Sequence, residues 1–348
     1  MHLAQFLIGP EASIIDAMAR LDKIDEKILY VVNKDDELLG AITDGDIRRY
    51  VLRNQSVIGD VAQVMFKQVR YLTKDSEESP ADFMKSQGLT SIPIVDKKLK
   101  VLAIEFLTGN KYYQINELNV PVVIMAGGKG TRLHPYTKIL PKPLIPIGDK
   151  TITEHIMSHF ELFGCNDFTM IVNYKKEIIK AFFNDVDINR KITFIEESVF
   201  QGTAGGLKLI QGKINKTFFM TNCDILVDEN YDDIYRYHKE NKNVLTMVCA
   251  LKREVIPYGV VTTTENGMAR KMEEKPQLEF LTNTGLYIIE PQFLEEIKEN
   301  EVVHITDVIQ KCIDKGLKVG VYPISENDWL DMGQMEQLDM MKKRLGID

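Results

Sequence analysis

A glycine-rich segment directly after an apolar run constrains the fold of this 348-residue chain more than any other feature. The apolar run, Val122–Ala126, has the length and composition of a buried parallel strand. Arg132 and Lys142 follow it closely and add a planar guanidinium and a point charge. Between them and the strand, three glycines leave backbone N–H groups open to a polyanion: Gly127, Gly128 and Gly130. The segment therefore predicts a strand that ends in a phosphate-binding loop.

The sequence pattern excludes two commoner glycine-rich loops, the dinucleotide-binding loop and the P-loop. Neither G-x-G-x-x-G nor G-x-x-x-x-G-K-[ST] occurs at this segment. The stretch Gly127–Ile147 instead resembles the signature of the sugar-phosphate nucleotidyltransferases, GGxGTRL followed by PKPLxPI. By that resemblance Arg132 and Lys142 are catalytic cations. The resemblance also implies that the loop binds the nucleotide through Ala126, Gly127, Gly128, Gly130 and Thr131.

Composition and charge narrow the class of partner. The apolar content of 44% is ordinary for a globular chain, and the net charge of −8 argues against nucleic acid or an anionic membrane as the main partner. Met1–Pro10 lacks the pattern of a signal peptide, and no apolar stretch approaches the roughly 20 residues that span a bilayer. The cysteines have no metal-ligand spacing and lie in apolar segments: Cys165, Cys223, Cys249 and Cys312. We expect a cytoplasmic protein with reduced, mostly buried thiols.

The first third of the chain contains an internal repeat, which we divide into residues 1–56 and 57–115. Each half predicts a helix, a strand, a polar turn and a second strand; the strands are Ile28–Val32, Leu38–Ile42, Ser91–Val95 and Leu99–Ile104. This order resembles a tandem pair of CBS domains, and Gly40–Arg49 is the most similar segment. By that resemblance Thr43 and Asp46 hold the ribose of an adenine nucleotide, and the pair associates into a homo-oligomer. The second half has no such Asp, so a purely structural or dimerising role stays open.

Strands and helices alternate over residues 120–348, as in βαβ units on a mostly parallel sheet. Thr151–Phe163 reads as a helix, and the candidate strands are Val122–Ala126, Phe168–Asn173, Lys191–Glu196, Phe218–Asn222 and Val244–Ala250. The predicted fold class is α/β, a Rossmann-like, GT-A-like nucleotidyltransferase domain preceded by an α+β CBS-domain pair. In such sheets ligands bind at the carboxyl ends of the strands, where the glycine loop and Asn222–Asp224 both fall.

The resemblance implies that a sugar-1-phosphate oxygen attacks the α-phosphorus of a nucleoside triphosphate and expels pyrophosphate. That nucleophile is already an anion, so alignment and charge neutralisation replace a general base. Mg²⁺ takes carboxylate and phosphate oxygens, and Asp224, directly after an apolar strand, is the first candidate ligand. Asp331 is the second, because Trp329–Gly333 resembles the family's W-x-D-[IM]-G motif. Cys223 has the character of a small buried residue.

The sugar site is predicted around a hairpin, Gly259–Thr264 and Met268–Glu274. Read alone, Glu274-Lys275-Pro276 is an exposed turn. By resemblance Lys275 binds the phosphate of the sugar-1-phosphate and is a catalytic cation. The same resemblance assigns the sugar to Gly259, Glu274, Asn283 and Gly285.

The choice of base depends on the segment after the strand Lys191–Glu196. Gln201–Gly205 resembles the family's L-G-T-A-G motif, so Gly202 and Thr203 pass close to the base and ribose. Glu197 is a carboxylate that only accepts hydrogen bonds, which suits the adjacent N1–H and N2–H donors of guanine. Uracil and thymine offer one donor between acceptors. GTP is therefore favoured over UTP or dTTP, although paired glutamates at a strand end are often simply solvated.

These patterns together predict a sugar-1-phosphate nucleotidyltransferase that requires Mg²⁺ and carries an N-terminal CBS pair. The fused arrangement is similar to the glucosamine-1-phosphate guanylyltransferases of bacterial legionaminic acid synthesis, which favours GTP and glucosamine-1-phosphate as substrates. The same enzyme class with UTP or dTTP and another hexose-1-phosphate is an alternative. A non-catalytic regulatory subunit that binds nucleotide is another. An adenine nucleotide bound at the CBS pair would add regulation to any of these.

Overall fold

The computed structural model describes residues 3–76, 78–108, 111–113, 116–185, 190–299 and 301–332. The chain divides into two compact units, Met1–Ile115 and Asn116–Asp348. Each unit has its own hydrophobic core. Among the described residues, no helix is long and apolar enough to cross a membrane.

The first unit repeats one strand order. In its first half β1 (Leu7–Ile8) pairs in parallel with β2 (Ile28–Val32), which pairs antiparallel with β3 (Leu38–Thr43). In its second half the same pairings join β4 (Leu72–Thr73), β5 (Ser91–Val95) and β6 (Val101–Phe106), and β7 (Lys111–Tyr113) adds an antiparallel strand. The helices are η1 (Leu3–Phe6), α1 (Ile14–Leu21), α2 (Asp44–Asn54), α3 (Val61–Val64) and α4 (Pro80–Gln87).

One strand of this unit begins later than the sequence pattern predicts. Leu99 belongs to the turn, where it has a positive φ of 64° and donates its backbone N–H to Asp96 O at 3.0 Å. Strand β6 therefore begins at Val101 instead of Leu99.

The second unit contains a seven-stranded sheet in the order β12-β11-β8-β13-β18-β15-β19. Strands β8, β11, β12 and β13 are mutually parallel, as are β15 and β19, and only β18 runs against its neighbours. The bounds are β8 (Val122–Ala126), β11 (Asp167–Val172), β12 (Lys191–Glu196), β13 (Phe218–Asn222), β15 (Leu245–Val255), β18 (Gln277–Ile289) and β19 (Val319–Ser325). The prediction of an α/β fold with a mostly parallel sheet is confirmed.

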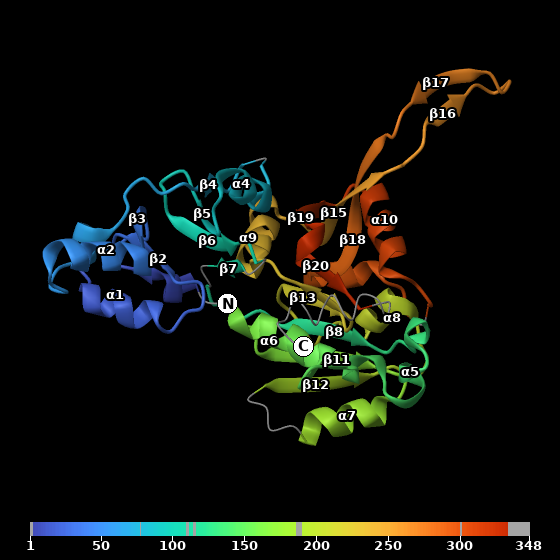
Figure 1. The fold of residues 1–348 in the computed structure, drawn as a ribbon. Coiled ribbons are helices and arrows are strands. Elements are labelled where there is room, and N and C mark those ends of the chain that lie inside the picture. Colours follow the sequence, from blue (N-terminus) through green and yellow to red (C-terminus); the bar gives the residue numbers. More distant parts are fainter. Residues whose placement is uncertain are drawn as a thin grey trace. The chain divides into compact units, whose positions relative to one another are not determined.

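Helices cover both faces of this sheet (Figure 1). On one face α6 (Ile152–Leu162) and α9 (Tyr231–Asn241) contribute an aromatic cluster in which Tyr231 packs against Phe160 and Phe219. On the other face α8 (Gly202–Lys208) and α10 (Ile305–Asp314) bury Leu207 and Ile309 against the strands. Helix α7 (Lys176–Asp185) packs beside the edge strand β12.

Short elements complete the second unit. The pairs β9–β10, β14–β20 and β16–β17 are two-stranded. The β16–β17 ribbon extends β15 and β18 away from the sheet (Figure 1). The bounds are β9 (Pro146–Ile147), β10 (Lys150–Thr151), β14 (Ile225–Val227), β16 (Val260–Thr263), β17 (Ala269–Glu273), β20 (Trp329–Asp331), η2 (Thr131–Leu133), α5 (Tyr136–Ile139), η3 (Lys142–Leu144), η4 (Pro291–Glu296) and η5 (Glu326–Asp328).

The topology predicts where a ligand binds. From β8 the chain builds outward through β11 and β12, and it then returns to place β13 on the other side of β8. The connections on the two sides of β8 therefore diverge at the carboxyl ends of β8 and β13. Such a switch point is the usual ligand site of an open parallel sheet.

Candidate functional site

A pocket of about 250 Å³ lies beyond the carboxyl end of β13. Its walls come from the loop after β8, the end of β13, the middle of β18 and strand β20. The lining residues are Arg132, Asn222, Asp224, Ile225, Asn283, Thr284, Gly285, Tyr287, Trp329 and Asp331. Five of the predicted site residues therefore meet in one pocket.

The two predicted metal carboxylates are brought together by a small antiparallel pair of strands. In the pairing of β14 with β20, Ile225 is the partner of Asp331, so Asp331 lies beside Asp224. The Met332 backbone N–H donates to Asp224 O at 2.9 Å and holds the two segments in register. Two adjacent carboxylates that line one pocket fit the oxygen-rich coordination of Mg²⁺, with phosphate and water oxygens as the remaining ligands. Among the described residues, no group of three or more His, Cys, Asp or Glu side chains is placed to hold a metal ion, so phosphate and water oxygens would complete the coordination.

Lys142 forms an ion pair with Asp224. Both side chains are largely buried, with exposed fractions of 13% and 10%. Lys142 begins η3, and the prolines on either side of it restrict the backbone from which its side chain starts. A lysine and a carboxylate in this position place a cation and an anion directly at the end of β13.

The glycine loop packs against the same lysine. Gly130 has a φ of +63°, and a Cβ there would lie 3.1 Å from Lys142 Cβ. The Thr137 hydroxyl donates to Gly130 O at 2.8 Å and fixes the turn. Gly128, in contrast, is exposed, and a Cβ there would meet nothing within 4 Å. The loop is therefore rigid at Gly130 and open to a ligand at Gly128.

Adjacent Glu196 and Glu197 have different environments. Glu196 is exposed and accepts hydrogen bonds from Lys176 at 2.6 Å and Lys180 at 2.7 Å, which lower its pKa to about 2. Glu197 is buried, and burial raises the pKa of its carboxyl group. Within the described residues, its side chain accepts only the Gln201 N–H, at 3.4 Å. Glu196 is thus the solvated member of the pair, while Glu197 is a buried acceptor.

Two glycines make room for the Glu197 carboxyl group. A Cβ at Gly127 would lie 2.6 Å from Glu197 Oε2, and a Cβ at Gly206 would lie 2.9 Å from Oε1. The carboxyl group therefore lies between the phosphate loop and α8. Sequence reasoning missed the role of Gly206, although its place in the GTAGG run was the available signal.

The sugar-site residues on β18 form a local hydrogen-bond set. Asn283 donates from Nδ2 to the Tyr287 hydroxyl at 2.7 Å, and its Oδ1 accepts the Gly285 N–H at 3.1 Å. Burial raises the pKa of Tyr287 to about 12, so its hydroxyl stays protonated. Gly285 has a φ of +90°, and a Cβ there would lie 2.6 Å from Asn222 Nδ2. Asn222, Thr284 and Tyr287 line the pocket without having been assigned a role from the sequence.

Ile225 and Trp329 also line the pocket, and neither was assigned a role of its own from the sequence. The Trp329 Nε1 is buried and makes no hydrogen bond within the described part of the chain. Lys252 Nζ lies 5.3 Å from the centre of the Trp329 ring, at a cation–π distance. The indole therefore brings an unused donor to the wall of the pocket.

Cys223 separates Asn222 from Asp224 and is buried. Burial and the neighbouring Asp224 raise the pKa of its thiol to about 12. A thiol with such a pKa is not a thiolate at neutral pH, which agrees with the interpretation of Cys223 as a small core residue.

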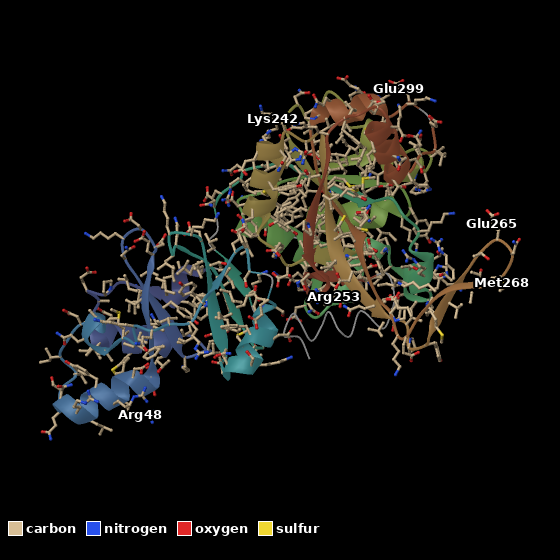
Figure 2. All side chains as sticks on the ribbon, turned by 90° about the horizontal axis from the view of Figure 1, so that it is seen from above. Arg48, Lys242, Arg253, Glu265, Met268 and Glu299 are labelled. Carbon is tan, nitrogen blue, oxygen red and sulfur yellow. The ribbon has the colours of Figure 1, made fainter. Side chains whose placement is uncertain are left out.

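Three predicted sugar-site residues do not line this pocket: Gly259, Glu274 and Lys275. They lie at the base of the β16–β17 ribbon, where both faces are exposed to solvent. Figure 2 shows Glu265 and Met268 near the outer end of that ribbon. A Cβ at Gly259 would approach Glu274 Oε2 at 3.1 Å, so these two residues are neighbours of each other. Their contact with a sugar remains a prediction.

Gly202 and Thr203 begin α8 and contact the segment before α10. A Cβ at Gly202 would lie 2.4 Å from Val303 O, and Thr203 Oγ1 accepts the Ile305 N–H at 3.0 Å. Close packing against this backbone explains both residue types. Their predicted contact with base and ribose stays untested, since neither residue lines the pocket.

Thr43 and Asp46 in the first unit form a capping box at the start of α2. The Thr43 backbone N–H donates to Asp46 Oδ2 at 2.9 Å, and the Asp46 N–H donates to Thr43 Oγ1 at 3.3 Å. Asp46 Oδ1 also pairs with Arg49 at 2.6 Å. This geometry gives both residues a structural role, while the predicted ribose contact stays a prediction.

A glycine-rich loop, two carboxylates and two cations lie at the switch point of a parallel sheet, an arrangement typical of α/β proteins that bind phosphorylated ligands. Comparison with known families gives the particular family. Residues 121–345 match the nucleotidyl transferase family, and the chain belongs to it. Residues 6–53 match the CBS domain.

Several curated relatives resemble the second unit. The mannose-1-phosphate guanyltransferase of Aspergillus oryzae is 33% identical over 222 residues, which cover 61% of this chain and 60% of that protein. The mannose-1-phosphate guanyltransferase of Hypocrea jecorina is 36% identical over 186 residues, which cover 51% of each chain. The chain thus spans about 60% of the length of the first of these relatives and half of the second.

Solved structures share the fold at lower identity. The crystal structure of HddC from Yersinia pseudotuberculosis complexed with GMP-PN superposes with a TM-score of 0.52 and 22% identity, covering 65% of this chain and 99% of that chain. A putative glucose-1-phosphate thymidylyltransferase from Bacillus anthracis superposes with a TM-score of 0.51 and 20% identity, covering 66% and 96%. At these identities, the similarity shows a shared fold and no more.

Proposed function

We propose that this protein is a sugar-1-phosphate guanylyltransferase, which joins GTP and a hexose-1-phosphate into a GDP-sugar and releases pyrophosphate. The observation that carries the proposal is the meeting of Asp224, Asp331, Lys142 and Arg132 at the switch point of the sheet. A non-catalytic nucleotide-binding subunit would have no need of this full set of charges.

The chemistry follows from charge. The attacking phosphate oxygen and the α-phosphate are both negative, so the barrier falls when cations and N–H donors surround the site of attack. Arg132 at the pocket wall and Lys142 at the end of β13 supply positive charge, and the open backbone at Gly128 supplies room for the phosphates. Asp224 and Asp331 would hold Mg²⁺, which family members generally use and which would neutralise phosphate charge.

Glu197 supports guanine as the base. It is a buried acceptor beside the phosphate loop and accepts only one long hydrogen bond, from Gln201 N–H, in the described chain. A buried carboxyl group with spare acceptor capacity is stabilised by donors, and guanine offers two on one edge. The mannose-1-phosphate guanyltransferases among the relatives are named for the same nucleotide.

The identity of the sugar is the most specific part of the proposal. The relatives' names make mannose-1-phosphate the first acceptor to test. Glucosamine-1-phosphate, and with it a place in legionaminic acid synthesis, remains the prediction from the sequence. Asn283, Tyr287 and Asn222 offer amide and hydroxyl groups that suit sugar hydroxyls without distinguishing these two sugars.

The test is pyrophosphate release by the full chain with Mg²⁺ over a grid of nucleotides and sugar-1-phosphates. We expect turnover with GTP and at least one of mannose-1-phosphate and glucosamine-1-phosphate. Turnover only with UTP or dTTP would contradict the role of Glu197 and keep the enzyme class. No pyrophosphate release with any substrate pair, even with AMP and ATP added as activators, would favour the regulatory subunit.

The Asp224→Asn variant separates an enzyme from a binding module. We expect it to lower kcat by roughly 10² to 10³, because one charged ligand and the Lys142 partner are lost together. A matched Asp228→Asn variant changes the same charge nearby, outside the pocket lining, and is expected to keep most of the turnover. Unchanged turnover in Asp224→Asn, measured at equal thermal stability, would contradict the assignment.

A further inference from the structure

A second cavity, of about 430 Å³, opens at the opposite end of the same sheet. It lies beside the amino ends of β8, β11 and β12, whereas the pocket of the proposed reaction lies beyond the carboxyl end of β13. Its floor includes Pro121, Thr169 and Ile195, and the segment 213–216 forms a wall. This cavity has no part in the proposed function.

On the face of β11 and β12 that forms the floor, the side chains change from charged to aliphatic along each strand. From the amino end inward, β11 presents an acid, a hydroxyl and an aliphatic side chain, and β12 presents a lysine, a hydroxyl and an aliphatic side chain. The aliphatic pair lies in the core with Leu207 of α8. The hydroxyl pair and the charged pair lie outside the part of the strands that α8 covers, and they line the cavity. In register, the pairs are Asp167 with Lys191, Thr169 with Thr193, and Ile171 with Ile195.

Three lysines give the cavity a net positive charge: Lys191, Lys213 and Lys216. Among the described lining residues Asp167 is the one acid, and its Oδ2 pairs with Lys191 Nζ at 3.2 Å. Lys216 donates to Asn119 O at 3.2 Å, a neutral acceptor that leaves its charge uncompensated. The Lys213 side chain makes no hydrogen bond or ion pair within the described part of the chain; its backbone N–H donates to Ile210 O at 2.9 Å. Among the described residues, no anion pairs with the charges of Lys213 and Lys216.

One hydroxyl group in the lining is available to a ligand. Thr169 is 7% exposed, and its hydroxyl forms no hydrogen bond with any described residue and is not closed off from solvent. A hydroxyl group in this setting can donate to and accept from a molecule in the cavity. Here it lies on the floor of a cavity lined by lysines, beside a wall that includes Ile214.

We propose that this cavity is a second binding site for a small organic phosphate, distinct from the substrate pocket. The ammonium groups of Lys213 and Lys216 are point charges that suit a phosphate monoester, and Thr169 and Asn215 offer polar contacts for its body. The volume is sufficient for a compact phosphorylated metabolite. A ligand bound there touches β8, β11 and β12 from their far ends, so it is positioned to influence the loop after β8.

The test is calorimetric titration of the full chain with D-glucose 6-phosphate at low ionic strength. We expect saturable binding that weakens at least tenfold in Lys213→Glu and several-fold in Thr169→Val. Lys298→Glu is the matched control, since Lys298 is 75% exposed, lies outside the cavity and gives the same change in net charge. Binding in Lys298→Glu should equal that of the unmodified chain.

Three results would overturn the proposal: no binding at millimolar ligand, equal weakening in Lys298→Glu and Lys213→Glu, or binding unaffected by both Lys213→Glu and Thr169→Val. Lys213 is exposed, so its replacement leaves the core intact even if Thr169→Val perturbs folding. The measurement records binding without turnover. Its outcome is therefore independent of the guanylyltransferase assignment.

Discussion

At the residue scale, burial gives two members of the same residue type different environments. Glu196 and Glu197 are adjacent in the chain, yet one pairs with surface lysines and the other lies under the phosphate loop. The alternation of side chains along a strand sends neighbours to opposite faces, so the pair could not share one environment. The sequence showed two carboxylates, and the position of each along the pleated backbone decided which one is buried.

The first prediction concerns the base. Glu197→Gln replaces a carboxylate by a near-isosteric amide that can accept at one oxygen only. We expect kcat/KM for GTP to fall by roughly tenfold, equivalent to the loss of one charged hydrogen bond of about 1.5 kcal/mol. The quantity to measure is the ratio of kcat/KM for GTP to that for UTP.

Glu196→Gln is the matched control, because it removes the neighbouring charge at an exposed position. Its GTP to UTP ratio should be that of the unmodified protein. An unchanged ratio in Glu197→Gln would show that this carboxyl group does not read the base.

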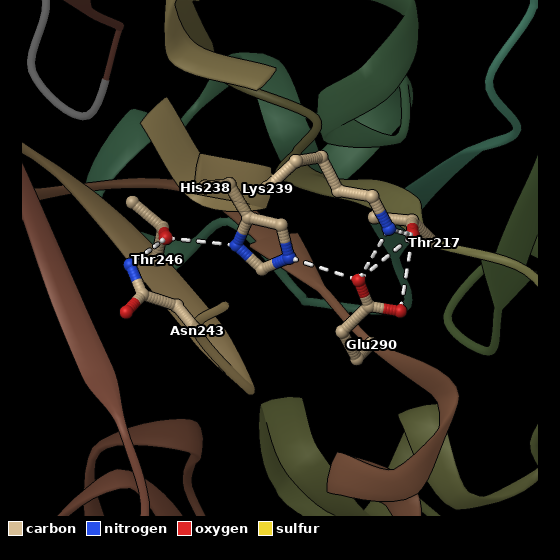
Figure 3. A network of polar contacts seen from close by, with 6 residues as sticks. All are labelled: Thr217, His238, Lys239, Asn243, Thr246 and Glu290. Atoms are coloured by element: carbon tan, nitrogen blue, oxygen red, sulfur yellow. Dashed lines mark hydrogen bonds and ion pairs between the residues drawn. The ribbon is translucent and has the colours of Figure 1, made fainter. Parts of the chain in front are cut away.

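At the element scale, polar contacts fix how individual helices join the sheet. His238 of α9 is fully buried and bridges two strands: its Nδ1 lies 2.8 Å from Thr246 Oγ1, and its Nε2 lies 3.3 Å from Glu290 Oε1 (Figure 3). Thr217 and Lys239 complete the coordination of Glu290 at 2.9 and 2.8 Å. This network ties α9 to β15, and to the ends of β13 and β18 that lie far from the pocket.

The second prediction is a pH dependence of stability. Burial lowers the pKa of His238, although Glu290 opposes that shift. Below the unfolded pKa of about 6.5 the unfolded state binds a proton that the folded state resists. The stability that neutral His238 provides is therefore complete above about pH 7.5 and decreases as the pH falls through 6.5.

The measurement is the urea midpoint of the second unit at pH 8 and pH 5.5, for the unmodified chain and for His238→Gln. The unmodified chain should lose more stability between these pH values than the variant. The difference between the two chains is the quantity to use, because burial also lowers the pKa of His159. Equal losses would contradict the role of His238.

The third prediction concerns helix caps. Thr43 begins α2 and Thr151 begins α6, each with a capping box to the acid three residues later. Thr43→Ala and Thr151→Ala should each lower the free energy of unfolding by about 1 kcal/mol, since backbone donors lose their acceptor. Each variant should affect only the unit that contains its helix. An effect of Thr43→Ala on adenine-nucleotide binding with no effect on stability would favour the ribose-binding prediction over the capping role.

At the scale of the whole molecule, the chain consists of two units with separate cores. The first unit matches the CBS domain only over residues 6–53, yet its two halves repeat one set of strand pairings. The second unit holds both cavities. Regulation of the second unit by a nucleotide in the first remains a prediction, tested by the response of turnover to AMP and ATP.

The fourth prediction is that calorimetry of the full chain resolves two unfolding transitions, because each core is closed within its own unit. Thr43→Ala should shift one transition and Thr151→Ala the other. A single transition shifted equally by both variants would mean that the two units unfold as one cooperative body.

Much of the fold follows from local sequence. Val122–Ala126, Lys191–Glu196 and Phe218–Asn222 have the predicted strand bounds because apolar runs end there at glycine or at polar residues. The continuation of β15 to Val255 was not predictable, since its exposed half pairs only with the outer half of β18. Exposed pairing of this kind leaves no hydrophobic period in the sequence.

The sequence by itself determined the second unit's family, the glycine-rich loop and the residue types of the candidate site, because each depends on a short local motif. Tertiary structure alone decided which of them meet. Asp224 and Asp331 lie far apart in the chain and become neighbours only through the β14–β20 pairing. Lys275 lies at the base of a ribbon outside the pocket. The second cavity is formed where the pairing of β11 with β12 places Thr169 beside Thr193, next to the segment 213–216. Strand register is set by long-range pairing, so no local pattern could have revealed these contacts.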